Sequence, residues 1–329
     1  MDAPAVLYAL RWLIHDTFRQ ALNSRVFWIM LGLSGLCILF CAGVSIEGGA
    51  ERDYNEFFDP KSGELIKPGS TSGHVSLLFG VFRYSFSRHV EPEVLFLYSI
   101  FASWVGGTLG ILVALVWTAG FVPEALQPSA ASVLLAKPVP RWLFLTGKYL
   151  GVICFIALHV TIFFVGTWLA LGFSTGVWQG EYLLGIPLMI FQFAAIFSFT
   201  VLIAVLFRST MACVIGGVFF WLVCYALNYG RHFAVVYNEL NPAGPELSSL
   251  TIGIADLGYW LLPKPIDLTI LLERSMNLAD VKMTIESQQP FKQVLGAGHF
   301  HPALSLLSSC LFPIFSLWAA ASQLAKTDY

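Results

Sequence analysis

Long apolar stretches separated by short polar segments make up most of this chain. Six of the stretches contain no Lys, Arg, Asp or Glu. They cover residues 26–44, 94–119, 149–173, 185–207, 211–230 and 303–321. About 20 apolar residues in a helix cross the hydrocarbon core of a bilayer, and lipid leaves the backbone of such a stretch no hydrogen-bonding partners but its own. The pattern therefore predicts an all-α polytopic membrane protein with six transmembrane helices.

The composition agrees with this class. Of the 329 residues, 57% are hydrophobic and 12% are charged, whereas a soluble domain has about 25% charged residues. The net charge of −2 does not favour nucleic acid as a partner, and the lipid bilayer is the expected surrounding. All six cysteines fall inside apolar stretches, which is typical of small buried hydrophobic residues rather than of disulfides.

The distribution of positive charge predicts the orientation. With the N-terminus inside, the inner segments are 1–25, 120–148, 208–210 and 322–329, and they hold eight Lys and Arg against four Asp and Glu. The outer segments hold ten cations against sixteen acids. Inner loops carry the excess of Lys and Arg, so we expect both termini on the cytoplasmic side.

The remaining segments complete the predicted organisation. Residues 1–25 form an amphipathic helix lying in the inner interface, and Asn23-Ser24-Arg25 makes a break before the first span. The apolar stripe of this helix carries Leu7, Leu10, Ile14, Phe18 and Ala21. Residues 26–230 hold five transmembrane helices, with an outer loop at 45–93 and a cytoplasmic loop at 120–148. Residues 208–210 form a tight hairpin. Residues 231–302 form a second outer loop with a short re-entrant element, and 303–329 hold the sixth helix and a cytoplasmic tail.

The inner segment 120–148 contains more signals than a connector needs. Pro123 suits the first turn of a helix, and Glu124 lies near that helix's positive end. Pro138 and Pro140 end any helix that precedes them. The alternative is a plain connector whose cations only anchor the inner face. We favour a short helix that lies across the inner face between two spans and moves both when it is displaced.

This segment resembles the first cytoplasmic loop of type-2 ATP-binding cassette (ABC) permeases. The matching residues are Glu124, Leu134, Leu135, Pro138, Val139, Arg141, Gly147 and Lys148. The six-span count, the N-terminal helix and the tight hairpin are also similar to that family. The resemblance implies that the loop is a coupling helix that docks on a separate ATPase subunit.

The resemblance also implies the residues and partners involved. The docking residues would be Glu124, Leu134, Leu135, Lys137, Arg141 and Lys148. The chain itself would hold no cofactor, and ATP and Mg²⁺ would bind to the ATPase partner. A second copy of the chain or a sister permease would complete the transporter. The expected activity is ATP-driven translocation, in the export direction usual for the family, across a bacterial cytoplasmic membrane.

The chain lacks a phosphate-binding loop of its own. Such a loop reads G-x-x-x-x-G-K-[ST], because its backbone N–H groups cradle phosphate. Here Tyr149 follows Gly147-Lys148, and Trp142 stands at the position of the first glycine. We therefore expect no ATPase activity and no other enzymatic activity in this chain.

Two strongly polar side chains fall inside the spans. His159 and Gln192 either line a translocation path or make hydrogen bonds between helices. Packing is favoured for Gln192, and both readings stay open for His159. His299 and His301 lie just outside the last span, where an interfacial pair is favoured over a metal site. A secondary carrier or a structural membrane protein without an ATPase remains the alternative, although the lack of acids in the spans counts against a proton-coupled carrier.

Overall fold

The computed structural model of the chain describes residues 3–47, 73–86, 90–127, 140–240, 247–278, 281, 284–298 and 300–326. Within these residues, six helices are long and apolar enough to cross a membrane. They are Arg25–Ala42, Glu91–Ala125, Arg141–Thr175, Gly180–Phe207, Thr210–Tyr237 and Pro302–Ala325. Each overlaps one predicted stretch, so the prediction of a mostly helical protein with six spans is confirmed.

The helices of the bundle have the following bounds. The first is α2 (Arg25–Ala42), and the second is made of α3 (Val90–Ser99), the π-helix η1 (Ile100–Gly110), α4 (Ile111–Thr118) and α5 (Phe121–Ala125). The others are α7 (Arg141–Thr175), the 3₁₀ turn η2 (Gly180–Leu184) with α8 (Gly185–Phe207), α9 (Thr210–Leu240) and α13 (Pro302–Ala325). Several run past the predicted stretches and take in charged residues, because backbone hydrogen bonding does not stop where apolar composition stops.

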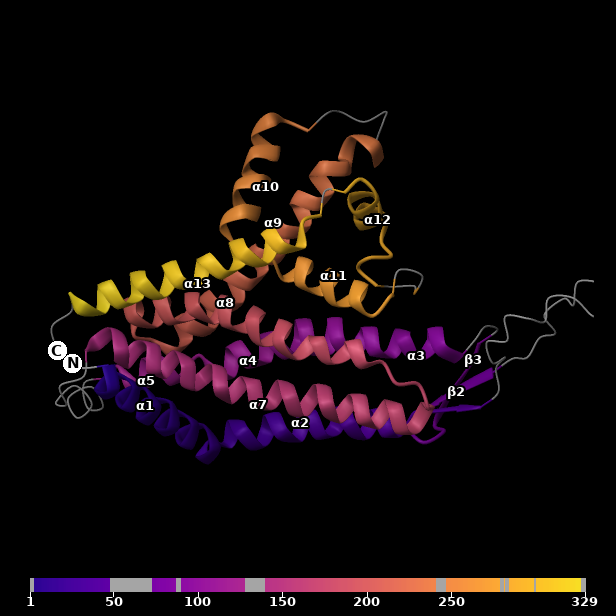
Figure 1. Cartoon of the computed structure of the whole chain (residues 1–329), viewed down its shortest axis with the longest axis horizontal. Helices are drawn as coiled ribbons and strands as arrows, with labels where there is room; N and C mark the ends of the chain where they lie inside the picture. Colours follow the sequence, from indigo (N-terminus) through magenta and orange to yellow (C-terminus); the bar gives the residue numbers. More distant parts are fainter. Residues whose placement is uncertain are drawn as a thin grey trace, which may run out of the picture.

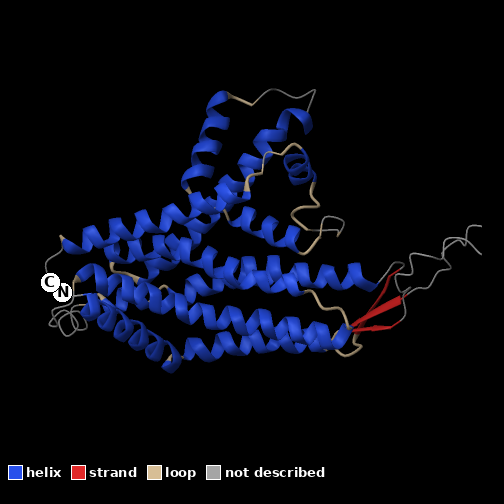
Figure 2. Cartoon of the chain, in the orientation of Figure 1, coloured by secondary structure: helices blue, strands red, loops and turns tan. Residues whose placement is uncertain are grey.

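The bundle has two distinct ends. The helix that precedes the spans, α1 (Ala3–Asn23), begins at the same end at which α13 stops, and α5 and the start of α7 lie there too (Figure 1). We call this the terminal end. The described strands all lie at the opposite end, the sheet end (Figure 2).

Helix α1 packs along α7 through two glycines. A Cβ on Gly147 would lie 2.7 Å from Leu13, and a Cβ on Gly151 would lie 2.5 Å from Thr17. The helix ends at Asn23, and Ser24 caps α2 by accepting from the Phe27 amide, which is the break that the sequence predicts. The fully buried face carries Leu13, Thr17 and Ala21. The row packed on α7 is thus rotated from the predicted apolar stripe, which leaves Leu7 exposed.

The hairpin between the fourth and fifth spans is as tight as predicted. Helix α8 ends at Phe207, and Arg208 adopts a left-handed conformation with φ 49°. The Ser209 hydroxyl accepts from the Ala212 amide, so two residues separate α8 from α9.

The first outer segment, 45–93, contains regular structure that the all-α prediction did not include. Strands β1 (Ser45–Glu47), β2 (Gly73–Leu77) and β3 (Phe82–Phe86) form an antiparallel sheet in the order β1-β2-β3. The turn between β2 and β3 has positive φ at Leu78, Phe79 and Gly80. Helix α3 then starts at Val90, before the end of the predicted loop.

The described residues of the segment predicted as the second outer loop, 231–302, are largely helical. Helix α9 continues the fifth span to Leu240. Three further helices follow, α10 (Ser249–Leu261), α11 (Pro265–Ser275) and α12 (Gln289–Gly296). The end of α9 stands out with α10 and α12 from one side of the bundle, while α11 lies against it (Figure 1). The apolar run 250–262, for which the sequence predicts the re-entrant element, forms most of α10.

Candidate functional site

The predicted docking segment is described at its two edges. Glu124 is exposed on α5. Arg141 opens α7, and its Nη1 donates to the carbonyls of Leu324 at 3.0 Å and Ala325 at 3.3 Å. These carbonyls belong to the last turn of α13, which leaves carbonyl groups without helical partners. Arg141 therefore ties the start of the third span to the end of the sixth. Leu134, Leu135 and Lys137 lie outside the described residues.

Lys148 is buried rather than presented on the surface. Its Nζ lies 3.2 Å from Asp16 Oδ2 and 3.2 Å from Gln20 Oε1, both on α1. Gln20 Nε2 in turn donates to Asp16 Oδ2 at 2.9 Å. Lys148 lies about two turns into α7, which packs tightly on α1, so its charge fastens α1 to α7.

The structure brings Glu124 and Lys148 to one cavity and leaves Arg141 apart. The cavity has a volume of about 400 Å³ and is lined by polar groups of Gln20, Ser24, Glu124 and Lys148. It lies where α1, α5 and α7 meet, at the terminal end. A displacement of α5 would therefore disturb the contact between α1 and α7.

His159 and Gln192 lie inside the bundle and do not share a cavity. His159 is 4% exposed, with its ring centroid 4.8 Å from that of Phe155 and 5.2 Å from that of Phe27. Neither of its ring nitrogens has a hydrogen-bond partner in the described part of the chain. It lines an apolar cavity of about 290 Å³. Gln192 is also buried, and its Oε1 has no partner among the described residues.

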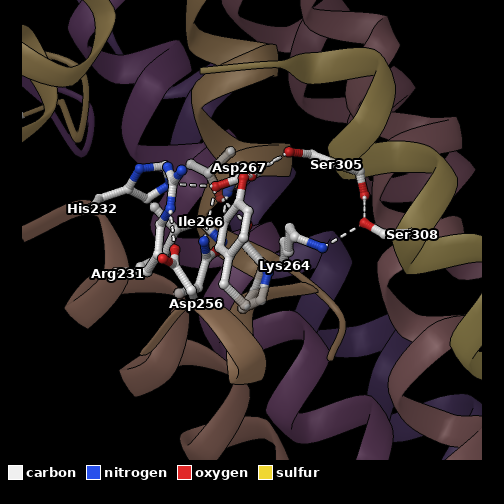
Figure 3. Close-up of polar contacts among 12 residues, drawn as sticks. Arg231, His232, Asp256, Lys264, Ile266, Asp267, Ser305 and Ser308 are labelled. Carbon is white, nitrogen blue, oxygen red and sulfur yellow. Dashed lines mark hydrogen bonds and ion pairs between the residues drawn. The ribbon is translucent and has the colours of Figure 1, made fainter. Parts of the chain in front are cut away.

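A buried carboxylate that the sequence prediction did not single out lies in the first turn of α11. Asp267 is 2% exposed and accepts four side-chain hydrogen bonds (Figure 3). Oδ1 accepts from His232 Nε2 at 2.6 Å and from Asn228 Nδ2 at 2.8 Å. Oδ2 accepts from the Tyr259 hydroxyl at 2.7 Å and from Ser305 Oγ at 2.6 Å. We call these five residues the Asp267 cluster.

The Asp267 cluster joins four helices at one point. Asn228 and His232 come from α9, Tyr259 from α10, Asp267 from α11 and Ser305 from α13. The Asn228 Oδ1 also accepts from the Ile266 and Asp267 amides, so it caps the first turn of α11. Burial alone would raise the pKa of Asp267, but the hydrogen bonds and charge of His232, with Ser305 and Asn228, lower it.

Lys264 lies beside the cluster at the α10–α11 corner. Its Nζ donates to Ser308 Oγ at 2.5 Å and stands 4.6 Å from the centre of the Tyr259 ring and 5.3 Å from that of Trp260. Burial lowers its pKa to about 8, and the nearby carboxylate of Asp267 opposes this shift. The Lys264 cation on the faces of Tyr259 and Trp260 thus stabilises the α10–α11 corner.

A second buried acid connects the π-helix to α11. Glu273 is fully buried. Its Oε1 accepts from Ser103 Oγ at 2.9 Å, and its Oε2 accepts from the Glu286 amide at 3.0 Å. Burial raises the pKa of Glu273. Since Ser103 belongs to η1, this contact joins the second span to α11.

One sequence signal pointed to Asp267. Pro265 followed by Asp267 is a helix start, since proline suits the first turn and an acid suits the positive end. The four hydrogen-bonding partners of Asp267 are spread over residues 228–305 and share no sequence pattern. Among the described residues, no group of three or more His, Cys, Asp or Glu could hold a metal ion. The four hydrogen bonds to Asp267 make the Asp267 cluster a joint between helices.

Fold and sites together define a polytopic membrane protein, mostly helical, with polar joints at the terminal end of the bundle and where α9, α10, α11 and α13 meet. No model of a known protein family matches the chain, and no curated protein matches it.

Proposed function

We propose that this chain is the membrane-spanning permease subunit of an ABC transporter. A separate ATPase subunit would bind ATP and Mg²⁺ and hydrolyse the ATP, and the chain would convert that motion into passage of a substrate. The six spans and the resemblance of segment 120–148 to the coupling loop of type-2 permeases support the proposal. A second copy or a sister permease would complete the assembly, and export across a bacterial cytoplasmic membrane is the expected direction and place.

The observation that carries the proposal is how the edges of this segment are fastened. On its far side, Arg141 donates to the last turn of α13. About two turns later in α7, Lys148 pairs with Asp16 of α1. On its near side, the exposed Glu124 lies on α5, the last part of the second span. A displacement of the segment would therefore reach the first, second, third and sixth spans, as a coupling element requires.

Copurification from the native host tests the proposal. The tagged chain is isolated in mild detergent, and the copurifying proteins are identified and quantified by mass spectrometry. The exposed Glu124→Ala variant probes docking without disturbing a packed contact. Glu181→Ala is the matched control, because Glu181 is also exposed but lies in η2, away from α5.

The expected result is a stoichiometric partner with a P-loop that is lost from Glu124→Ala and retained by Glu181→Ala. The purified pair should hydrolyse ATP, and the Glu124→Ala chain should fail to alter the partner's rate. Recovery of the chain alone, under conditions that keep other membrane complexes intact, would refute the ATPase-coupled function. A carrier or a structural protein would then be the better assignment.

A further inference from the structure

The apolar cavity beside His159 lies within the membrane-spanning part of the bundle. Its volume is about 290 Å³, at the lower end of the ~300–1,000 Å³ usual for small-molecule sites. Side chains of α2, η1, α4, α7 and α8 line it. Two lining residues, Leu33 on α2 and Leu109 on η1, are 48% and 57% exposed. The cavity therefore opens to the apolar surface of the bundle.

The wall opposite α2 is partly the π-helix. Val105, Gly106, Leu109 and Gly110 of η1 all face the cavity. A π-helix has a wider backbone than an α-helix, is rarely longer than one turn, and occurs often at functional sites. A Cβ on Gly106 would approach the rings of Phe163 and Phe164 to 3.2 and 3.3 Å. The glycine thus lets this wall lie close to α7.

His159 is the polar group that this cavity leaves without a partner. Both of its nitrogens are buried and unbonded within the described residues, and its ring is fixed between Phe27 and Phe155. A buried polar group without a hydrogen bond costs about 1–3 kcal/mol. A ligand that supplies the missing hydrogen bond would recover this energy.

The lining also defines the chemistry of the ligand. None of the residues around the cavity is Lys, Arg, Asp or Glu, so a charged ligand would find no counter-ion there. We propose that the cavity binds an apolar molecule from the bilayer that carries one uncharged hydrogen-bonding group, such as a long-chain alcohol, and that His159 bonds that group. This binding needs no ATPase, so the inference does not rest on the proposed transport function.

Photolabelling of the purified full chain in phosphatidylcholine vesicles tests the site. Two probes of equal chain length carry the same diazirine and alkyne, and one ends in a hydroxyl while the other ends in a methyl group. Val113→Trp fills the cavity from α4. Val116→Trp is the matched control, because Val116 is on the same helix but is 39% exposed and does not line the cavity. His159→Phe keeps a ring and removes both nitrogens.

The wild-type chain should be labelled on α4 and α7, with the alcohol preferred over the alkane about tenfold, as one hydrogen bond of ~1.4 kcal/mol gives. Val113→Trp should abolish labelling by both probes, and Val116→Trp should not change it. His159→Phe should keep the alkane labelling and lose the preference for alcohol. Equal labelling of Val113→Trp and wild type, or no preference for alcohol in wild type, would overturn the proposal. If Val113→Trp fails to fold, the comparison of the two probes in wild type and His159→Phe decides alone.

Discussion

Asp267 shows what one buried side chain does in this protein. Its two oxygens take hydrogen bonds from three helices besides its own. If the carboxylate were removed, His232 Nε2 and Asn228 Nδ2 would lose the hydrogen bonds they make to it, and the Tyr259 and Ser305 hydroxyls would keep only the bond between them. Such networks are worth more than the sum of their pairs, because each group depends on all the others for its partner.

The substitution Asp267→Ala should therefore destabilise the chain strongly. We expect a loss of about 3–5 kcal/mol, the usual cost of removing one member of a buried charged pair. Thermal unfolding in detergent measures it. Asp256→Ala is the matched control, since Asp256 pairs with Arg231 at 3.4 Å but is 47% exposed, and its loss should cost less than about 1 kcal/mol. Equal effects of the two substitutions would contradict the role of Asp267 as a joint.

Lys264 makes stability depend on pH in the alkaline range. Its pKa is lowered from 10.5 to about 8 by burial, so between these values the unfolded chain binds a proton that the folded chain has released. Stability should therefore rise with pH from about 8 to 10.5, by up to ~1.4 kcal/mol per pH unit. The titratable groups that act on the pKa of Lys264 are Asp267 and Cys224, which raise it, and Arg231, which lowers it.

The variant Lys264→Met isolates this effect. Unfolding midpoints are compared at pH 8 and pH 10 for wild type and variant. The stability of wild type relative to the variant should rise with pH, because the folded wild-type chain no longer holds a buried charge at high pH, whereas the variant never has one. A constant difference over this window would show that the amine keeps an ordinary pKa.

At the scale of the element, α1 depends on glycines in α7 for its position. Leu13 and Thr17 occupy the space that side chains at Gly147 and Gly151 would take, and the Lys148–Asp16 pair closes the same contact. Gly147 and Lys148 thus both serve the packing of α1 on α7, in addition to their resemblance to the coupling loop of type-2 permeases.

The substitution Gly151→Leu should displace α1 from α7. Overpacking of a close contact costs about 1–3 kcal/mol, and α1 should lose protection from amide hydrogen exchange while α8 keeps it. Gly32→Leu is the control, because a Cβ on Gly32 meets nothing within 4 Å. Unchanged exchange of α1 in Gly151→Leu would mean that the helix is held elsewhere.

At the scale of the whole molecule, the ends of the bundle predict the topology of the chain. Helices α1 and α13 meet the terminal end, and the β2–β3 turn lies at the sheet end (Figures 1 and 2). Protease-sensitive tags at the N- and C-termini should therefore be cut together in inside-out vesicles. A protease site inserted in the turn at 78–81 should be cut only in right-side-out vesicles. Cleavage of one terminal tag from each side would refute both the six-span count and the predicted cytoplasmic termini.

The sequence alone determined the number and order of the spans, the break at Ser24 and the hairpin at 208–210. These features depend on local composition and capping, which neighbouring residues supply. The outer segments were harder to predict, because their strands and helices are short and are stabilised by packing against distant parts of the chain. Helix α11 has a local start signal in Pro265 and Asp267, yet its first turn is capped from a distance by Asn228 of α9.

Only the tertiary structure decided which polar residues serve as joints and which are left open. Lys148 reads as a surface cation, yet it is buried because α1 folds back over α7 and brings Asp16 to it. Asp267 lies in a segment read as an outer loop, yet it accepts hydrogen bonds from three other helices. His159 could have bonded a neighbouring helix, but the bundle leaves it facing an apolar cavity. Apolar length is a property of each segment, whereas the pairing of polar groups depends on how distant segments meet.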